Sequence, residues 1–254
     1  MQNVSFVDRL ILWVKRAESP LPRAIKRTFR YIAAPTVFRL PRRLAGPLRA
    51  LYEFHYIVIS AWRTVVTVLY RGPLFQARCA SFGRNVRMDG PMPYVDGHVQ
   101  IHVGDDVNFG GGVSIASGRM FEQPRLIIGD RVSIGWGTRI TVSREVVIED
   151  DVWLPWNCSI SDTDGHPREA DRRIAMLPPD PKDIRAVRIC KKAWIGSGTR
   201  IMKGVTIGEG AIIGAGSVVI SNIPPYSLAM GNPAEVILKN FGLPSTAKGK
   251  TPVE

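Results

Sequence analysis

Residues 189–219 repeat with a period of six, and this period limits the possible folds more than any other feature. An aliphatic residue recurs at every sixth position without slippage: Ile189, Ile195, Ile201, Ile207, Ile213 and Val219. A period of six matches neither the 3.6 residues of an α-helix nor the alternation of a plain strand. It predicts short strands joined by tight turns and coiled into a parallel sheet, with one aliphatic side chain per turn pointing inward.

The same rhythm extends back to Phe82, and its interruptions follow a rule. Extra residues enter after Ile115, Ile140 and Ile160, each time after the third unit of a triplet. If three units complete one turn of a triangular prism, all insertions leave from the same edge of about five to six coils. The longest insertion, 161–188, exceeds an ordinary connection, so we interpret it as a functional loop.

The charge is concentrated at the N-terminus. Residues 1–80 carry 14 basic and 3 acidic side chains, a net charge of +11, whereas the remaining 174 carry 20 and 19, a net charge of +1. Prolines at 20, 22, 35, 41 and 47 divide this arm into short helical pieces, followed by a longer segment over 51–70. Basic amphipathic helices with aromatic residues suit an anionic membrane surface. Packing against the body or a sister subunit is the alternative, and no recognised module indicates nucleic acid.

We therefore divide the chain into three parts. Residues 1–80 form a basic helical extension, residues 81–222 form the coiled domain with its loop 161–188, and residues 223–254 form a capping segment and tail. Pro224 and Pro225 end the repeat because they cannot donate ladder hydrogen bonds. A short helix over 233–240 is expected to close the open end, with a disordered tail behind it.

Cysteine content and hydropathy indicate a cytoplasmic protein. Cys79, Cys158 and Cys190 are too few and too scattered for a disulfide framework or zinc cluster, so we expect reduced thiols and no metal. The apolar run over 56–70 is interrupted by Arg63, so no membrane span is expected. The start has no positive region before its apolar stretch, so no signal peptide is expected. We expect a cytoplasmic location, peripheral on the inner membrane face.

Three motifs in order identify a family resemblance. The hexads, DGHP at 164–167 and IPPYSLAMGNPAEVI at 223–237 together resemble the hexapeptide-repeat acyltransferases, in particular the maltose, galactoside and nodulation O-acetyltransferases. The resemblance covers about residues 82–240 and leaves out 1–80. It implies a left-handed parallel β-helix, a homotrimer whose active sites lie between subunits, and acetyl-CoA as the acyl donor.

His166 is the candidate catalytic residue. Acyl transfer to a hydroxyl needs a base that works near neutral pH, and imidazole meets that need. Of the four histidines, only His166 lies on the long loop, between Gly165 and Pro167. The resemblance implies that it is the general base. Asp164 or Asp162 could hold its second ring nitrogen, with Asp164 our candidate catalytic partner, although a solvated loop carboxylate explains either residue equally well.

The resemblance also implies where the donor binds. Small turn residues that line the pantetheine arm correspond to Ser197 and Ala215, and an aromatic near the site corresponds to Trp194. The hexad pattern requires small residues at such turns in any case. Two basic residues typical of the family are replaced by Ser221 and Glu235. Lys239, Lys203, Arg185 and Arg188 remain unranked candidates for the CoA phosphates.

The acceptor is the least defined part of the prediction. Phe109-Gly-Gly-Gly112 replaces a segment that holds the sugar in galactoside-type enzymes, and a glycine run opens space or brings backbone close to substrate. With the basic arm, this favours a saccharide on a lipid carrier or a surface polysaccharide. The predicted function is therefore O-acetylation of a saccharide in polysaccharide biosynthesis.

Several alternatives stay open. The same donor and base serve N-acetylation of an amino sugar nucleotide, and a degenerate β-helix can be a non-enzymatic scaffold. A γ-class carbonic anhydrase needs three histidines that converge on zinc, but His98 and His102 share one short segment with no third imidazole in neighbouring coils. Serine acetyltransferase also has helices before a β-helix, but its characteristic residues are not recognisable here.

Overall fold

The computed structural model describes residues 41–118 and 120–242. The chain divides into two compact units, residues 1–58 and 59–254. Within the described residues, no helix combines the length and the hydropathy that crossing a membrane would demand. The predictions for residues 1–40 and for the tail beyond 242 lie outside the described residues.

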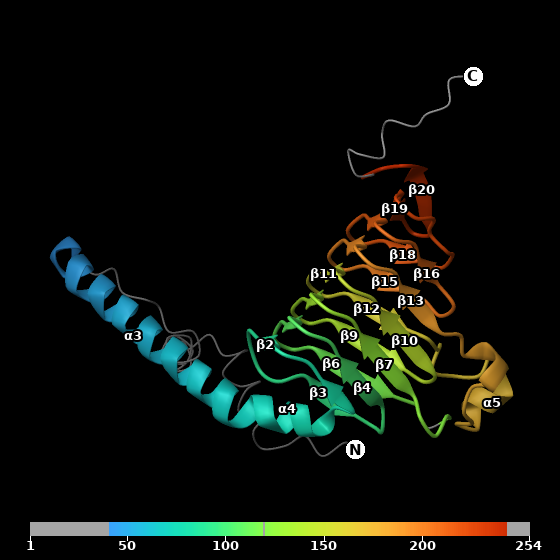
Figure 1. Ribbon diagram of the computed structural model, residues 1–254, viewed down its shortest axis with the longest axis horizontal. Coiled ribbons are helices and arrows are strands. Elements are labelled where there is room, and N and C mark those ends of the chain that lie inside the picture. Colours follow the sequence, from blue (N-terminus) through green and yellow to red (C-terminus); the bar gives the residue numbers. More distant parts are fainter. Residues whose placement is uncertain (1–40, 119, 243–254) are drawn as a thin grey trace, which may run out of the picture. The chain divides into compact units, whose positions relative to one another are not determined.

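The described part of the N-terminal extension is helical. A 3₁₀ turn η1 (Arg42–Leu44) leads into α3 (Ala45–Val66), followed by a π-helical turn η2 (Thr67–Arg71) and α4 (Gly72–Arg78) (Figure 1). Pro47 was expected to break this segment, but it lies in the first turn of α3, where its missing N–H breaks no intrahelical hydrogen bond. The predicted long segment over 51–70 is confirmed. No side chain of α3 is buried.

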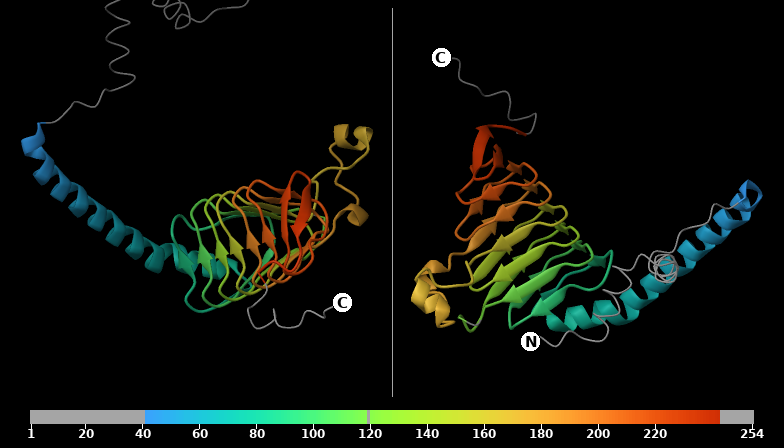
Figure 2. Two further views of the ribbon diagram at one scale, coloured as in Figure 1. Left: turned by 90° about the horizontal axis from the view of Figure 1, so that it is seen from above. Right: turned by 180° about the vertical axis from the view of Figure 1, so that it is seen from behind.

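The body is a parallel β-helix with three sheets, here called A, B and C (Figure 1, Figure 2). Sheet A contains β1 (Ser81–Phe82), β4 (Gln100–Val103), β7 (Arg125–Ile128), β10 (Glu145–Ile148), β13 (Val187–Ile189) and β16 (Thr206–Ile207). Sheet B contains β2 (Arg87–Met88), β5 (Asn108–Phe109), β8 (Ser133–Ile134), β11 (Trp153–Leu154), β14 (Trp194–Ile195), β17 (Ile212–Ile213), β19 (Leu228–Gly231) and β20 (Ala234–Leu238). Sheet C contains β3 (Tyr94–Asp96), β6 (Ser114–Ser117), β9 (Arg139–Val142), β12 (Ser159–Ser161), β15 (Arg200–Ile201) and β18 (Val218–Val219). The predicted fold class, a left-handed parallel β-helix with a helical N-terminal extension, is confirmed.

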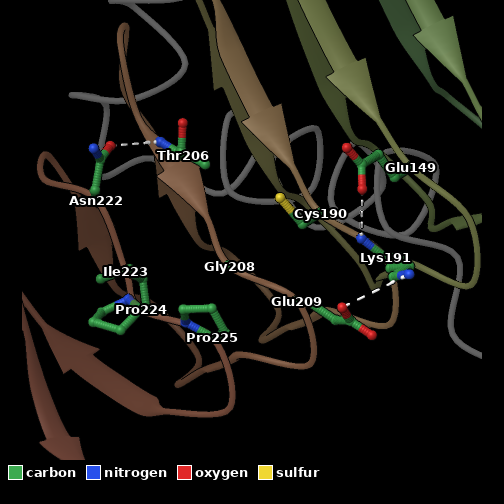
Figure 3. Close-up of a pocket in the computed structure, with 10 residues that line it drawn as sticks. All are labelled: Glu149, Cys190, Lys191, Thr206, Gly208, Glu209, Asn222, Ile223, Pro224 and Pro225. Carbon is green, nitrogen blue, oxygen red and sulfur yellow. Dashed lines mark hydrogen bonds and ion pairs between the residues drawn. The ribbon is translucent and has the colours of Figure 1, made fainter.

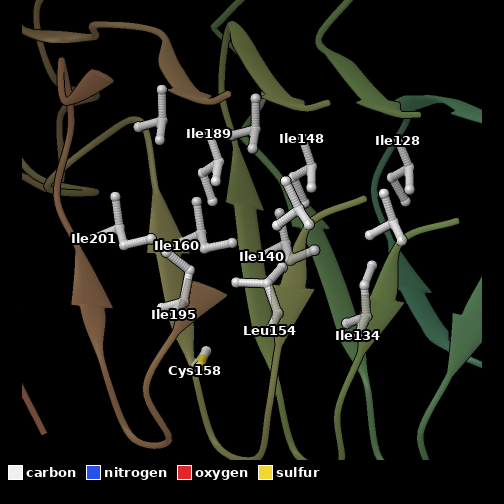
Figure 4. Packing of buried hydrophobic residues seen from close by; sticks show 14 of the residues in the cluster. Ile128, Ile134, Ile140, Ile148, Leu154, Cys158, Ile160, Ile189, Ile195 and Ile201 are labelled. Carbon is white, nitrogen blue, oxygen red and sulfur yellow. The ribbon is translucent and has the colours of Figure 1, made fainter. Parts of the chain in front are cut away.

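The hexad residues form the core of this β-helix. In sheet A, Ile148 of β10 pairs with Ile189 of β13, and in sheet C, Ile160 of β12 pairs with Ile201 of β15. Figure 4 shows these side chains stacked inside the coil, one inward row per sheet. Cys158 lies among them, and burial raises the pKa of its thiol to about 11, so it remains a protonated apolar group.

Helix α4 closes the N-terminal end of the core. Phe75 is 2% exposed, and its ring meets those of Phe82 and Phe109 edge to face, with centroids 6.0 and 5.3 Å apart. Without this helix, the inward residues of the first coil would face water. Part of the N-terminal extension therefore belongs to the core of the β-helix.

The C-terminal end corrects one prediction. Residues 234–238 form strand β20, not a helix, and β20 pairs with β19 in antiparallel orientation at the end of sheet B. The alternating segment around Val236 supplies ladder partners for β19, whose edge would otherwise be unpaired. Tertiary pairing therefore decided the conformation of this short segment.

The three long edges of the prism are named by the sheets they join: A–B, B–C and C–A. The connection after β6, the connection after β9 and the long loop after β12 all run from sheet C to sheet A. The prediction that all insertions leave from one edge, the C–A edge, is confirmed.

Candidate functional site

The long loop leaves the C–A edge after Ser161 and carries helix α5 (Ala170–Ile174) and a 3₁₀ turn η3 (Pro181–Asp183). Its two ends are joined, because the backbone N–H of Arg185 donates to the carbonyl oxygen of Asp162 at 3.0 Å. The loop therefore begins and ends at one fixed place on the C–A edge.

Asp162 anchors the start of the loop. Its fully buried carboxylate accepts backbone N–H groups from Ser143 (2.7 Å), Arg144 (2.6 Å) and Glu145 (2.9 Å). Burial raises the pKa of Asp162, while these three donors act in the opposite direction. Asp162 thus fixes the preceding coil's C–A connection and is not free to orient a loop histidine.

His166 lies exposed on the loop. Gly165 before it has φ +81°, and its N–H donates to Oγ1 of Thr163 at 3.0 Å; Pro167 after it is buried. The guanidinium of Arg173 donates to the carbonyl oxygen of Pro167 at 3.1 Å and also to that of Arg168. The backbone on both sides of the imidazole is therefore held, while the ring itself faces outward.

Asp164 occupies a different position from the one expected of a catalytic partner. Its Oδ2 lies 2.5 Å from Nζ of Lys203, whose side chain is 6% exposed. Among the described residues, no hydrogen bond joins His166 to Asp164 or to Asp162. Because the ammonium group of Lys203 is paired with the carboxylate of Asp164, Lys203 is not a free cation for the CoA phosphates. Arg188 is likewise paired, with Glu149 at 2.6 Å.

The predicted donor residues lie at or beside the B–C edge. Trp194 stands on the outer face of sheet B and is 51% exposed. Ser197 follows β14 and Ala215 follows β17, and both are exposed at tight turns. The two turns stack, because the N–H of Gly216 donates to the carbonyl oxygen of Ser197 at 2.8 Å. Small side chains leave this part of the edge open.

Sheet C separates the two groups within one chain. His166 belongs to the C–A edge, and Ser197 and Ala215 belong to the B–C edge. The structure therefore brings the three donor residues close to one another but does not bring them to His166. A single chain contains both halves of the predicted site on opposite sides of one sheet.

The glycine run 110–112 has a structural cause. A Cβ atom on Gly111 would lie 2.4 Å from the indole ring of Trp136 on the next coil. Gly111 therefore makes room for Trp136, and the space that we expected to be open to substrate at this turn is filled by an aromatic side chain.

Sequence reasoning missed a row of outward side chains on sheet B. Parallel pairing aligns one residue from each of six consecutive strands: Arg87, Asn108, Ser133, Trp153, Trp194 and Ile212. Trp153 is 62% exposed, and the turns beside the row carry the exposed Trp136 and Trp156. Each row member immediately precedes an inward hexad residue. Tryptophan at that position, as in Trp153 and Trp194, was the sequence signal that could have revealed the row.

A cavity of about 450 Å³ near the C-terminal end of sheet A contains none of the predicted residues (Figure 3). Its charged groups satisfy one another. The N–H of Lys191 donates to Glu149 at 3.1 Å, and the ammonium of Lys191 lies 3.8 Å from Glu209. Because these charges are already paired, the cavity offers no unpaired charge to a ligand.

The remaining histidines of the β-helix have ordinary partners. Nε2 of His98 lies 2.8 Å from the carbonyl oxygen of Phe121, and Nδ1 of His102 lies 3.0 Å from Oγ of Ser81. In the part of the chain that the structure describes, no three His, Cys, Asp or Glu side chains are arranged to hold a metal ion.

Comparison with known proteins supports the assignment of the repeat. Residues 186–221 match the family model described as bacterial transferase hexapeptide (six repeats). A protein of Saccharomyces cerevisiae named "Putative acetyltransferase YJL218W" is 40% identical over 114 residues, which are 45% of this chain and 56% of that protein. The chain thus spans about half the length of this relative.

Solved structures of similar fold include two transferases. AntD, an N-acyltransferase from Bacillus cereus in complex with dTDP and 3-hydroxybutyryl-CoA, has a TM-score of 0.52 and 16% identity, over 66% of this chain and 87% of that chain. A maltose O-acetyltransferase from Clostridium difficile 630 has a TM-score of 0.43 and 25% identity, over 66% and 74%. The hexapeptide match and the named relative confirm the resemblance inferred from the motifs: this chain is a hexapeptide-repeat β-helix protein similar to proteins named acetyltransferases.

Proposed function

We propose that this protein is an acyltransferase that moves the acetyl group of acetyl-CoA to a hydroxyl group of a saccharide. The observation that carries the proposal is the loop, which holds an exposed His166 between a fixed glycine and a buried proline. The hexapeptide match and the names of similar proteins support the reaction class.

His166 acts as the general base. The imidazole takes the proton of the acceptor hydroxyl as its oxygen attacks the thioester carbonyl, and the C–S bond breaks as the new C–O bond is completed. The imidazolium then returns the proton to the departing thiolate, which leaves as free CoA. No covalent enzyme intermediate is needed, because donor and acceptor bind together.

Two copies of the chain form each site, and three copies close a ring. The separation of His166 from Ser197 and Ala215 by sheet C supports this arrangement. In a trimer, the C–A edge of one copy meets the B–C edge of the next, and the same contact repeats around the axis. The exposed apolar residues Ile174 and Met176 on the loop suit such a contact.

The donor lies along the B–C edge. Ser197 and Ala215 leave space for the pantetheine arm, and the exposed indole of Trp194 stands beside it. The acyl-CoA in the AntD complex, which shares the fold, supports this cofactor assignment. Arg185 and Lys239 remain candidates for the CoA phosphates.

The N-terminal extension places the enzyme at a membrane surface. Helix α3 leaves its aromatic and aliphatic side chains exposed, among them Tyr52, Phe54 and Trp62, at 63%, 63% and 64%. Such a helix gains free energy by inserting its apolar side chains among lipids, while basic residues contact anionic headgroups. Sedimentation with anionic vesicles at low salt tests this point, and full-length protein that stays in the supernatant would refute it.

The assay for the function is acetyl transfer to saccharide acceptors in the presence of acetyl-CoA. His166→Ala should lower turnover by about 10²–10⁴-fold because a general base is lost. The affinity for CoA should stay unchanged. Unchanged turnover would refute the role of His166. Competition between hydroxyl and amino sugar acceptors separates O-transfer from the alternative, N-transfer to an amino sugar nucleotide.

A further inference from the structure

A cavity of about 750 Å³ lies between the last turns of α3, the turn η2 and the first coils of the β-helix. Its walls include three arginine side chains, Arg63, Arg71 and Arg87, together with the carboxylate of Asp89 and the indole of Trp136. These residues all belong to the compact unit 59–254. The charges of the wall sum to +2 at neutral pH.

The helical wall of this cavity is mostly polar, although the segment is rich in apolar residues. Ser60, Arg63, Thr64, Thr67 and Arg71 follow one another at helical spacing and line the cavity, together with one apolar residue, Val68. Apolar residues between them, such as Trp62, Val65 and Leu69, do not line it and remain exposed. A stripe that simply packed on the β-helix would be apolar, so a polar stripe here needs another explanation.

The described part of the chain does not neutralise these three arginines. Among the described residues, no ion pair joins Arg63, Arg71 or Arg87 to a carboxylate; Arg71 donates one long hydrogen bond, 3.4 Å, to the carbonyl oxygen of Gly90. Asp89 accepts a hydrogen bond from Nδ2 of Asn108 at 2.8 Å. Three guanidinium groups around one cavity favour a phosphate, whose oxygens accept several charge-assisted hydrogen bonds.

A row of outward side chains leads from the cavity toward the predicted donor site. Arg87 is the first member of the outward row on sheet B, which runs through Asn108, Ser133 and Trp153 to Trp194. Four strand spacings separate the two ends, about 19 Å. Two smaller cavities share Asp89, Asn108, Ser133 and Trp153, so the surface beside this row is hollowed. Oδ1 of Asn108 is buried there without a hydrogen-bond partner.

We propose that the arginine cavity binds a phosphate or diphosphate ester on the acceptor, whose saccharide extends along sheet B toward Trp194. This inference rests on the proposed function, because it assigns the acceptor class of the same site. The phosphate can belong to a lipid carrier or to a nucleotide. The apolar residues exposed beside the cavity suit a lipid carrier.

The first experiment measures binding of inorganic pyrophosphate to the full-length protein by calorimetry. We expect saturable binding, and at least tenfold weaker binding for the Arg63→Gln/Arg71→Gln variant. Arg87→Gln, at an exposed position on the far wall, should weaken binding as well. Arg139→Gln changes the same charge at an exposed strand position of sheet C outside the cavity and should bind like the wild type. Equal affinity in all four proteins would overturn the proposal.

A second experiment separates the two sources of the phosphate. Phosphatidylcholine vesicles with and without a polyprenyl phosphate are compared with soluble UDP-N-acetylglucosamine. Retention that needs the polyprenyl phosphate and Arg87 identifies a lipid carrier, and Arg87-dependent binding of the nucleotide sugar alone identifies a nucleotide carrier. Either result supports the phosphate site. If the protein bound neither the polyprenyl phosphate vesicles nor the nucleotide sugar, the proposed phosphate site would be overturned.

A third measurement keeps this inference apart from the proposed function. CoA affinity should be unchanged in the arginine variants, because Ser197 and Ala215 lie at the B–C edge near the other end of the row. Loss of CoA binding would assign the cavity to the donor and overturn the proposal. His166→Ala should bind pyrophosphate normally, so an inactive base and an absent phosphate site give different results.

Discussion

The C–A and B–C edges of the β-helix differ in how the chain connects one sheet to the next. The C–A edge carries a long loop held by Asp162, Arg173 and the Lys203–Asp164 pair. Along its predicted donor turns, the B–C edge carries only tight turns with small residues such as Ser197 and Ala215. A catalytic side chain needs a segment that can project it, whereas an extended cofactor needs open backbone. The two halves of the proposed site therefore require different edges, and one chain cannot place both at the same point.

The most sensitive test of this comparison is complementation between two inactive variants. His166→Ala disables the C–A edge, and Ala215→Trp fills the B–C edge and should weaken CoA binding more than tenfold. Co-expression should restore about a quarter of the sites in randomly mixed trimers. A working site needs its loop from an Ala215→Trp chain and its turn from a neighbouring His166→Ala chain, and each condition is met half of the time. The measurement is acetyl transfer by the purified mixture, scored against each variant alone.

The control is a mixture of the separately purified variants without subunit exchange, which should remain inactive. If co-expressed chains were no more active than either parent, both edges would have to serve the same site within one chain, and the composite site would be wrong.

Asp162→Asn should weaken the C–A edge most strongly. The amide offers one acceptor oxygen where the carboxylate offers two, so at least one of three backbone donors loses its partner. We expect the free energy of unfolding to fall by about 1–3 kcal/mol. Thermal unfolding followed by circular dichroism measures this change. Asp171→Asn, at an exposed position of the same loop, is a weaker perturbation, and equal losses in the two variants would contradict an anchoring role for Asp162.

Gly111→Ala tests the space requirement of the B–C edge. Overpacking against Trp136 should cost about 1–3 kcal/mol of stability. The same substitution in a Trp136→Ala background should cost less, because the new methyl group then meets no indole. Chemical denaturation of the four proteins gives the coupling energy, and equal costs in both backgrounds would show that the indole is not the reason for the glycine.

Lys203→Met should have the smallest effect. The thioether fills the space of the buried lysine stem, and Asp164 is 40% exposed and can be solvated. We expect a stability change within about 1 kcal/mol, together with a modest loss of turnover as the loop loosens. Turnover of Asp164→Asn provides the comparison. A far larger loss in Asp164→Asn would restore Asp164 as the partner of His166.

The sequence was informative wherever a local rule repeats. Inward hexad residues such as Ile195 and Ile201 fixed the strand period, and the insertions after Ile115, Ile140 and Ile160 located the C–A edge. The same periodicity could not predict strand β20, because five residues carry too little pattern to outweigh pairing with β19. Likewise, Pro47 was misinterpreted because its effect depends on its place in the helix.

The sequence by itself determined the coil, its decorated edge and the one histidine on the long loop. Only the tertiary structure decided which polar residues meet: Asp164 with Lys203, Asp162 with the backbone of 143–145, and Arg63 and Arg71 with Arg87 at one cavity. The physical reason is the separation of the contacting residues along the sequence. Hexads are local and recur every six residues, whereas these contacts join residues 16 to 39 positions apart. Such contacts form only when the coils stack and the helices dock.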